Sequence, residues 1–438
     1  MGAGEARVKV CVFGLWHLGP VTAAGLAKAG HEVVGLDDAA DAAKGLSAGK
    51  PPLFEPGLEE LVKEGLASRK LRFTVDAADA LKDADAVWVT FDTPVDDEDR
   101  ADVAFVESRV RGLFPLLKSG ALVLISSQAP VGTTRGLEKS YRKSFPGKPA
   151  SFACLPENLR LGRALSVFLE PDRVVAGVRT EADRLKVAAL LAPIKAKIEW
   201  MSVESAEMTK HALNAFLAAS VAFMNEIAVL CERVGADAKE VERGLKSESR
   251  IGPKAYLAPG GAIAGGTLAR DLRFLSEIGR RTGCETRLIG GVLAANEGHK
   301  TWSGRKLLEK LKNLKGRKVG VLGLTYKPGT DTLRRSGAVE LCRWLEREGA
   351  RVWAHDPAVK ALPTELVAVL HLAVNPEDLL RDSDAVVVAT EWPEFKKLSA
   401  EQLVKAMKTP VVVDPNRFLF DALGGDARLS YSAVGVPR

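Results

Sequence analysis

The stretch from Glu204 to Glu226 constrains the fold more than any other part of this sequence, because it predicts one long helix. Alanine, leucine and methionine dominate it, and neither proline nor glycine interrupts it. Sequence typical of α/β domains lies on both sides, so this helix is expected to bridge two domains. Lys210 and Asn214 lie four residues apart and therefore on one face of it. Two interpretations are open: a lysine at the edge of a core beside a locally bonded asparagine, or a pair that points into a cleft between the domains.

Composition limits the class of protein. A chain of 438 residues predicts two to three domains, and 46% hydrophobic with 27% charged residues is typical of a soluble globular protein. A net charge of +6 is too small to make nucleic acid the expected partner, but it suits a small anionic ligand. Five scattered cysteines without metal-binding spacing indicate reduced thiols and no metal site. We expect a cytoplasmic protein without a membrane partner, because we find neither a signal peptide nor an apolar run long enough to span a bilayer.

The first forty residues predict a βαβ unit of the dinucleotide-binding kind. A short apolar strand at 8–13 ends at Gly14, the segment GLWHLG follows, and a helix-like segment leads to a second strand that ends in Asp37 and Asp38. An acid at this position accepts hydrogen bonds from a ribose diol and repels a 2′-phosphate, which favours NAD over NADP. Trp16 stands where the usual pattern has its middle glycine, so an ordinary βα turn in an α/β domain is the alternative.

Polar residues follow the next predicted strands where each strand ends. Thr93 follows the strand at 84–91, Gln128 follows the strand at 121–127, and Glu157 lies at the end of the strand at 151–158. Because open α/β sheets bind ligands at the carboxyl ends of their strands, these side chains are expected to line one crevice together with Asp37. For any one of them alone, an ordinary turn residue is the better explanation.

The second half of the chain carries two further signals. A glycine-dense loop, SRIGPKAYLAPGGAIAGG, turns helical at about Thr267, and its backbone amides suit phosphate or sugar oxygens; a plain surface loop is the alternative. A second βαβ unit then follows, and its first loop holds Lys327, Arg334 and Arg335, which favours a phosphorylated ligand. The whole pattern predicts an α/β fold with two Rossmann-like, doubly wound domains at 1–200 and 312–438. A long central helix and a helical middle domain at 201–311 join them.

These pieces together resemble one known family. In chain order they are GLWHLG at 14–19, KPPLFEPGLEEL at 50–61, Thr93-Pro94, PVGTT at 130–134, PENLR with PDRVVAG, KHALNAF at 210–216, NE at 225–226, RIGPKAYLAPGGAIAGGTLARD at 250–271, TYKPGTDTLRRS at 325–336 and VVVDPNRF at 411–418. Single pieces are weak, but the ordered set is specific. The chain resembles the UDP-glucose/GDP-mannose dehydrogenase family over nearly its whole length.

The resemblance implies an enzyme that oxidises the C6 alcohol of a nucleoside diphosphate sugar to a carboxylate in two hydride steps. NAD would bind the first domain and the nucleotide sugar the third, and two protomers would form a homodimer through the central helical region. The implied catalytic residues are Lys210 and Asn214 at the developing oxyanion, Glu157 and Asp271 for handling water, and Thr267 at the nucleophile's position. The implied cofactor contacts are Gly14, Trp16, His17, Leu18, Gly19, Asp37, Thr93, Gln128 and Arg334. The implied substrate contacts are Glu157, Arg250, Tyr256, Gly265, Lys327 and Arg417, with Arg250 reaching the substrate of the neighbouring protomer.

The chain departs from the family pattern at several positions. Trp16 replaces a glycine, Gln128 replaces a threonine that usually meets NAD, and Ala42 replaces a basic residue that touches the ribose. The family's loop pattern GGxCxxKD reads AGGTLARD at 264–271, so an ungapped match puts Thr267 in place of the nucleophilic cysteine. Three functions therefore remain open: oxidation to the uronic acid, a single oxidation that stops at an aldehyde or keto sugar, and a non-catalytic protein that binds NAD and a nucleotide sugar.

Overall fold

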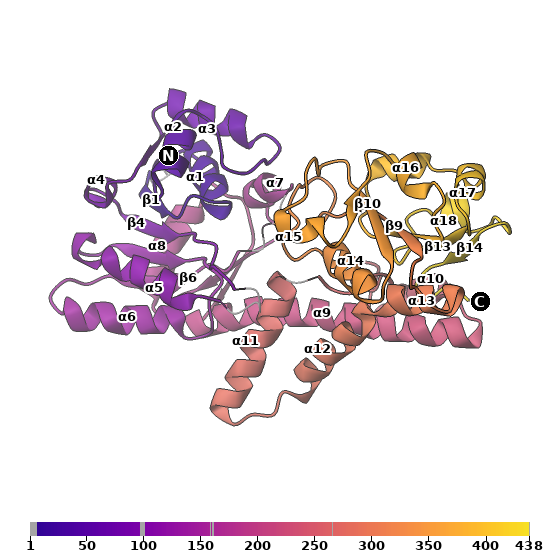
Figure 1. Cartoon of the computed structure of the whole chain (residues 1–438). Coiled ribbons are helices and arrows are strands. Elements are labelled where there is room, and N and C mark those ends of the chain that lie inside the picture. Colours follow the sequence, from indigo (N-terminus) through magenta and orange to yellow (C-terminus); the bar gives the residue numbers. More distant parts are fainter. Residues whose placement is uncertain (1–6, 97–100, 158, 160–161, 265, 438) are drawn as a thin grey trace. The chain divides into compact units, whose positions relative to one another are not determined.

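The computed structural model describes residues 7–96, 101–157, 159, 162–264 and 266–437. It divides into two compact units, residues 1–212 and 213–438. Each unit contains one sheet with helices on both faces, and a long helix runs through the division between them (Figure 1). The predicted α/β fold with two Rossmann-like domains and a long central helix is confirmed. The division into three domains stays a prediction.

The sheet of unit 1 has the strand order of a dinucleotide-binding domain. Among the described residues it runs β3-β2-β1-β4-β5-β6-β7-β8, and all neighbours are parallel except β6 and β7. The chain order therefore reverses between β1 and β4, which is the switch point where such sheets bind ligands. Its strands are β1 (Lys9–Phe13), β2 (Glu32–Leu36), β3 (Leu71–Thr74), β4 (Ala86–Val89), β5 (Leu122–Ile125), β6 (Ser151–Cys154), β7 (Val174–Gly177) and β8 (Ile198–Met201).

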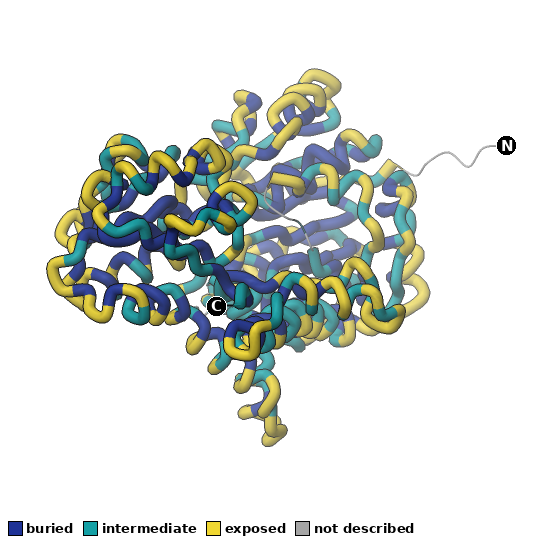
Figure 2. The backbone as a smooth tube through the Cα atoms, turned by 90° about the vertical axis from the view of Figure 1, so that its right-hand side faces the viewer, coloured by how far each residue is buried: buried dark blue, intermediate teal, exposed yellow. Residues whose placement is uncertain are grey.

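Helices cover both faces of this sheet because its strands are apolar on both sides. Along β1, Val10 and Val12 join one core cluster while Cys11 and Phe13 join the other, as the alternation of a strand requires. The central strands β4 and β5 are accordingly buried along their whole length, and buried stretches of the chain are dark blue in Figure 2. The helices of unit 1 are α1 (Leu18–Lys28), α2 (Ala40–Ser47), α3 (Leu58–Ala67), α4 (Ala77–Leu81), α5 (Val103–Gly112), η1 (Phe114–Leu116), α6 (Thr133–Ser144), α7 (Ala164–Leu169) and α8 (Glu181–Leu191).

Unit 2 repeats the same strand order in a smaller, all-parallel sheet, β11-β10-β9-β12-β13-β14. Its described strands are β9 (Lys318–Leu322), β10 (Arg351–His355), β11 (His371–Leu372), β12 (Ala385–Val388), β13 (Val411–Val413) and β14 (Ser430–Ser432). Its helices are α10 (Ala238–Ser247), α11 (Thr267–Thr282), α12 (Arg287–Lys300), α13 (Trp302–Leu311), α14 (Gly337–Arg347), α15 (Thr364–Val367), α16 (Pro376–Leu380), η2 (Pro393–Lys397), α17 (Ala400–Ala406) and α18 (Phe420–Leu423). Helices α11 and α12 pack against each other as a hairpin (Figure 1).

The long helix α9 (Val203–Val234) has 32 residues and is the one described helix that is long and apolar enough to cross a bilayer. The expectation that no apolar run reaches that length is therefore wrong. Protein packing accounts for part of its apolar surface, while Phe216, Phe223, Leu230 and Val234 are exposed. Val203 and Ala206 belong to a core cluster of unit 1, and Met224 and Ala228 belong to the main core of unit 2. We conclude that α9 is a core helix of the folded protein.

Buried polar side chains on α9 support the same conclusion, because each of them bonds to protein. Glu232 is an example from the last turns of the helix. Its carboxylate accepts hydrogen bonds from the Trp302 indole (2.9 Å) and the Gly435 amide (3.1 Å), and it pairs with the Lys306 ammonium (2.7 Å). A buried carboxylate with these partners ties α9, α13 and the C-terminal segment of unit 2 together.

Candidate active site

The turn after β1 is fixed from three sides in unit 1. Gly14 has φ of 101°, a left-handed conformation, and a Cβ on it would lie 2.9 Å from the Phe91 ring. Its carbonyl accepts a hydrogen bond from Thr90 Oγ1 (2.7 Å), and Asp37 Oδ2 accepts one from the Leu15 amide (2.6 Å). Side chains that follow β2 and β4 thus hold the turn at the switch point of the sheet.

Helix α1 starts directly after this turn. A Cβ on Gly19 would lie 1.8 Å from the Gly14 carbonyl oxygen, so the helix packs on the turn as closely as glycine allows. No side chain caps this helix by a hydrogen bond. Trp16, at the position of the missing middle glycine, is 55% exposed, whereas Leu18 is buried. Uncapped backbone N–H groups at the start of a helix form a binding site for a phosphate group.

His17 belongs to a contact that the sequence analysis missed. Its Nε2 lies 3.0 Å from Oε1 of Glu55, which is buried, and the same carboxylate accepts hydrogen bonds from the amides of Gly162 (2.5 Å) and Ala164 (3.1 Å). Glu55 therefore links the turn after β1 to the segment that starts α7. The only signal for it in the sequence was its place in the segment FEPGLEEL.

The first turns of α9 fasten to the loops that follow β5 and β6. Glu207 accepts hydrogen bonds from the amides of Gly132 (2.6 Å) and Thr134 (3.0 Å) at the start of α6, and His211 Nε2 lies 3.0 Å from the Ala129 carbonyl oxygen. Between them, Lys210 Nζ donates to the Glu157 carbonyl oxygen (2.7 Å). This arrangement holds the Lys210 ammonium at the carboxyl end of β6. Glu207 and His211 lie on the same face of the helix as Lys210 and Asn214. This spacing could have identified them from the sequence.

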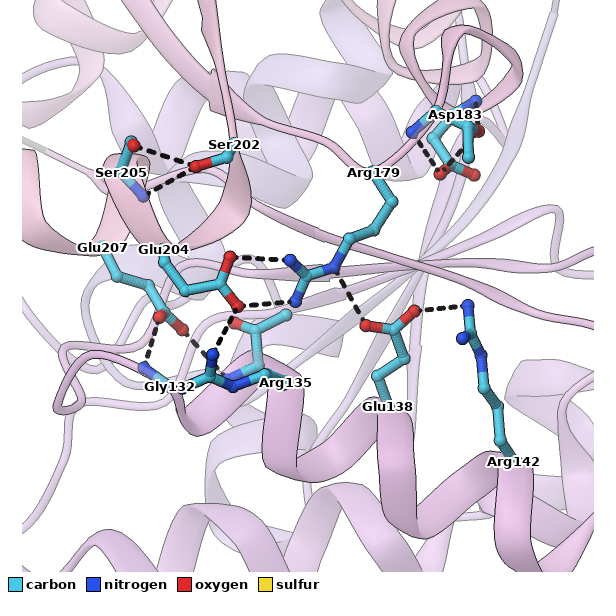
Figure 3. Close-up of polar contacts among 12 residues, drawn as sticks. Gly132, Arg135, Glu138, Arg142, Arg179, Asp183, Ser202, Glu204, Ser205 and Glu207 are labelled. Carbon is cyan, nitrogen blue, oxygen red and sulfur yellow. Dashed lines mark hydrogen bonds and ion pairs between the residues drawn. The ribbon is translucent and has the colours of Figure 1, made fainter.

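The remaining predicted residues of this crevice lie close by. Thr93 is buried, and its hydroxyl donates to the Gln128 carbonyl oxygen (2.6 Å), so the loops after β4 and β5 are joined. In the same unit, Arg179 forms two hydrogen bonds with Glu204 and one with Glu138 (Figure 3). The bonds from the Arg179 guanidinium lower the pKa of the Glu204 carboxyl, so this pair stays ionised.

In unit 2, Asn214 and Asp271 are direct partners. Asn214 Nδ2 donates to Asp271 Oδ2, and Asp271 is fully buried. Thr267 is the first residue of α11, one helical turn before Asp271, and it is exposed. Thr267, Tyr256 and Tyr326 line a cavity of about 290 Å³. Gly265, predicted to contact substrate, lies outside the described residues.

Four polar side chains frame the glycine-dense loop before α11. Asn225 bonds both to the Gly260 amide (3.0 Å) and to the Gly261 carbonyl (3.2 Å). The other three are Asn296, His299 and Asn416. Asn296 forms hydrogen bonds with the amide and the carbonyl of Ile263. The His299 ring bonds to the Gly260 carbonyl, and the Asn416 side-chain oxygen accepts from the Gly261 amide. Burial lowers the pKa of His299, against the effect of its carbonyl partner, so the neutral ring is favoured. Asn225 and Asn416 lie in the quoted segments NE and VVVDPNRF, whereas the sequence analysis missed Asn296 and His299.

The framed loop forms one wall of a larger cavity in unit 2, of about 480 Å³. Trp302, Trp344, Thr325 and Tyr326 line it as well. Such a volume, with aromatic walls and exposed backbone groups, is in the range of small-molecule sites.

The four basic residues predicted to contact ligands differ in exposure and in their partners within the protein. Lys327 is half-buried and Arg334 exposed, both in the segment between β9 and α14 of unit 2. Arg250 is exposed and pairs with Glu248 two residues away. Arg417 is buried, and its guanidinium bonds to Asp237 (2.7 Å) and to the Gly435 carbonyl (3.0 Å), which holds the C-terminal segment. The ligand contacts of all four stay predictions.

Three models of one family match successive parts of the chain. In the UDP-glucose/GDP-mannose dehydrogenase family, the NAD binding domain matches residues 8–195, the central domain 204–298 and the UDP binding domain 320–421. The chain belongs to this family. It is an NAD-dependent nucleotide sugar dehydrogenase, and the predicted cofactor is confirmed. The part of the chain that the structure describes contains no group of three or more His, Cys, Asp and Glu side chains able to hold a metal ion.

Individual relatives cover the chain almost completely. A UDP-glucose 6-dehydrogenase of Rhizobium meliloti is 34% identical over 98% of this chain and 100% of its own length. A UDP-glucose dehydrogenase from Pyrobaculum islandicum superposes with a TM-score of 0.88 at 33% identity, covering 100% of this chain and 99% of that one. A UDP-D-ManNAc dehydrogenase from Pyrococcus horikoshii has a TM-score of 0.85 at 26% identity, with 97% and 99% covered. The same fold thus occurs in proteins named for different sugars.

Gly19→Ala should impair the NAD site. The added Cβ cannot fit against the Gly14 carbonyl, so α1 must move away from the turn, at a cost of about 1–3 kcal/mol in folding stability. We expect NAD binding, measured by isothermal titration calorimetry, to weaken at least about tenfold, which corresponds to roughly 1.4 kcal/mol.

Gly136→Ala is the matched control, because no atom lies within 4 Å of a Cβ at Gly136 in α6. This variant should bind NAD normally and be as stable as the parent or up to about 1 kcal/mol more stable. Unchanged NAD binding by Gly19→Ala would show that the turn does not require close packing.

Proposed function

We propose that this protein oxidises a sugar alcohol of a nucleoside diphosphate sugar, with UDP-glucose as the leading candidate substrate. The observation that carries the proposal is the almost full-length match to UDP-glucose 6-dehydrogenases at 30–34% identity. The cavity of about 480 Å³ in unit 2 supports it, because part of its lining, including Thr325, Trp344 and Asn416, falls in the segment that matches the UDP binding domain. We propose that this cavity holds the nucleoside diphosphate. Lys327, Tyr256 and Arg417 are not among the described residues that line it, and their substrate contacts stay predictions.

The residues of unit 1 fit NAD. The uncapped first turn of α1 suits the pyrophosphate, and Asp37 suits the adenosine ribose. When bound, NAD supplies the acceptor for the hydride that leaves the sugar carbon. Trp16, His17, Thr93 and Gln128 would contact it from the surrounding loops, and Arg334 stays a predicted cofactor contact.

Lys210 is proposed to stabilise the negative charge that develops on the sugar oxygen. Its ammonium already donates to the Glu157 carbonyl, and the bonds of Glu207 and His211 fix the helix on either side of it, so the donor is oriented before substrate binds. Asn214 would assist it from the next turn of α9. Glu157 and Asp271 would position or deprotonate water, although Asp271 already accepts a hydrogen bond from Asn214.

Lys210 can be tested directly. The wild-type protein should form NADH, measured at 340 nm, with at least one member of a panel of UDP- and GDP-sugars. Lys210→Ala should lose on the order of a hundred- to a thousand-fold in turnover while NAD and nucleotide binding survive, because one preorganised donor is removed. A variant that melts earlier but keeps its turnover would instead indicate a purely structural lysine. No NADH with any sugar would favour the non-catalytic alternative.

The second oxidation is where this chain is proposed to differ from its family. Thr267 stands at the nucleophile's position, and a threonine hydroxyl is essentially un-ionised at neutral pH without an adjacent base. No described cysteine replaces it. Cys284 follows the far end of α11, about 25 Å away at 1.5 Å per residue. Burial raises the pKa of Cys11 and Cys342 to about 12, and Cys154 and Cys231 are also buried with a raised pKa.

We therefore propose a dehydrogenase whose second step is slow or absent. The products to distinguish are a released aldehyde, a uronic acid formed through the aldehyde hydrate with water as the oxygen source, and a keto sugar from a ring alcohol. Mass spectrometry after long incubation should show mainly the product of one oxidation, with close to one NADH per sugar. Thr267→Cys should raise carboxylate formation towards two NADH per sugar if oxidation occurs at C6. Rapid conversion to the uronic acid by the wild type would contradict this proposal.

The protein is further proposed to act as a cytoplasmic homodimer through α9. Phe216, Phe223 and Leu230 are exposed in the single chain at intervals of seven residues, which places them on one face of the helix, and exposed Val234 extends that face. An apolar stripe of this kind on a helix marks a protein interface, and a second copy of the chain is the proposed partner. Arg250 is proposed to reach the partner's substrate.

Sedimentation velocity tests the dimer. The wild type should sediment as a dimer at micromolar concentration, and Phe216→Glu with Phe223→Glu should yield monomers, because two charges would be buried in the interface. Leu185→Glu is the control, since Leu185 is 64% exposed on α8 away from the stripe. A wild-type monomer, or equal behaviour of both variants, would refute the interface.

A further inference from the structure

Two of the cavities in unit 2 share one wall. The cavity of about 480 Å³ and the cavity of about 290 Å³ are both lined by Gly261, Ala262, Ile263, Ala264 and Tyr326. The larger is the proposed nucleotide site, and the smaller is lined by Thr267 as well. Because the other shared residues are glycine, alanine and isoleucine, Tyr326 is the shared residue whose side chain can form a hydrogen bond.

We propose that Tyr326 is a specificity-determining residue for the substrate: its hydroxyl bonds to the sugar in the smaller cavity and so places the sugar beside Thr267. This inference rests on the proposed function, because it takes the larger cavity as the nucleotide site. It goes further by assigning the smaller cavity to the sugar. Within the segment TYKPGTDTLRRS, the sequence pointed to the basic residues and not to Tyr326.

Three hydrogen bonds fix the backbone at Tyr326. Its amide donates to the Thr332 carbonyl oxygen (2.9 Å). The preceding residue, Thr325, is buried; its amide donates to Asp356 Oδ2 (2.9 Å), and its carbonyl oxygen accepts from Thr390 Oγ1 (2.7 Å). Tyr326 therefore follows the fixed turn after β9, and its side chain is 40% exposed. A side chain on a fixed backbone is positioned before the ligand binds, which lowers the entropic cost of binding.

The Tyr326 hydroxyl reaches the start of α11. It lies 3.7 Å from the point that a Cβ on Gly266 would occupy, and Gly266 directly precedes Thr267. Thr267 is exposed. A phenol can both donate and accept a hydrogen bond, and so can each hydroxyl of a sugar. The Tyr326 hydroxyl is therefore a suitable partner for a sugar hydroxyl next to the position of the family's nucleophile.

Few other side chains of the smaller cavity can bond to a sugar. Apart from Tyr326, Tyr256 and Thr267 are the polar side chains among its described lining residues, while Val221 and Leu268 add apolar surface. A sugar hydroxyl that leaves water for this space needs a partner, because a buried polar group without a hydrogen bond is unfavourable. Loss of the Tyr326 hydroxyl should therefore weaken binding of the sugar and leave binding of the nucleotide unchanged.

Tyr326→Phe removes only the hydroxyl and keeps the ring. We expect this variant to bind UDP as tightly as the wild type and UDP-glucose about three- to tenfold more weakly, because one neutral hydrogen bond is lost. Isothermal titration calorimetry on the full-length protein measures both ligands without turnover. Unchanged binding of UDP shows at the same time that unit 2 of the variant is folded.

Tyr141→Phe is the matched control. Tyr141 is buried in the core of unit 1, and its hydroxyl has no hydrogen-bond partner among the described residues. The same oxygen atom is removed from the protein, but away from both cavities. UDP and UDP-glucose should therefore bind this variant as they bind the wild type.

Three outcomes would overturn the inference. They are an unchanged affinity of Tyr326→Phe for UDP-glucose, an equal loss for UDP and UDP-glucose, which would place the hydroxyl on the nucleotide, and an equal loss in Tyr141→Phe. Failure of the wild type to bind UDP would instead refute the nucleotide site proposed for unit 2. If another UDP-sugar of the panel proves to be the substrate, that sugar replaces UDP-glucose in the same comparison.

Discussion

A carboxylate at the end of the second strand, bonded to the backbone that follows the first strand, is the interaction on which both units depend. In unit 1, Asp37 accepts from the Leu15 amide; in unit 2, Asp356 accepts from the amides of Leu324 and Thr325. Burial opposes ionisation of Asp356, but these backbone bonds dominate and lower the pKa of its carboxyl, so the anion persists. Each carboxylate fixes the backbone of the turn at the switch point of its sheet, which is where sheets of this kind bind ligands.

The two units then use this turn in different ways. A left-handed glycine follows the first strand in both, Gly14 with φ of 101° and Gly323 with φ of 91°, and each packs against residues that follow the fourth strand of its own sheet. In unit 1 the helix starts at once, and its uncapped N-terminus suits a pyrophosphate. In unit 2 a longer segment with basic side chains intervenes before α14, and its N-cap Ser336 bonds to the Ala338 amide. The same strand order therefore carries two different loops at its switch point, which illustrates how function resides in loops rather than in the fold.

The buried polar residues of helix α9 are all bonded to other parts of the protein. In its first turns, Glu207 bonds to the start of α6 and His211 bonds to the loop before α6. Further along the helix, Asn214 bonds to Asp271 and Asn225 bonds to the glycine-dense loop. Each would be unfavourable on an apolar helix without its partner, and each fixes one turn of α9 to a loop of its own unit. Thr267, which stands where the family pattern has a cysteine, lies on α11 and not on α9. The hydrogen bonds that position Lys210 therefore do not involve it.

The sequence by itself determined the fold class, the family, the cofactor turn and the lysine–asparagine pair, because these depend on local patterns: strand alternation, glycine at a left-handed turn, and side chains one helical turn apart. It did not determine Glu55, Glu207, Asn296 or His299. Their partners are distant in the chain, as with Glu55 and Ala164, which are 109 residues apart. No local pattern specifies which carboxylate meets which backbone amide. Only the packing of the strands and helices brought them within hydrogen-bonding distance, and the same packing decided that an apolar helix of membrane-spanning length is a core helix.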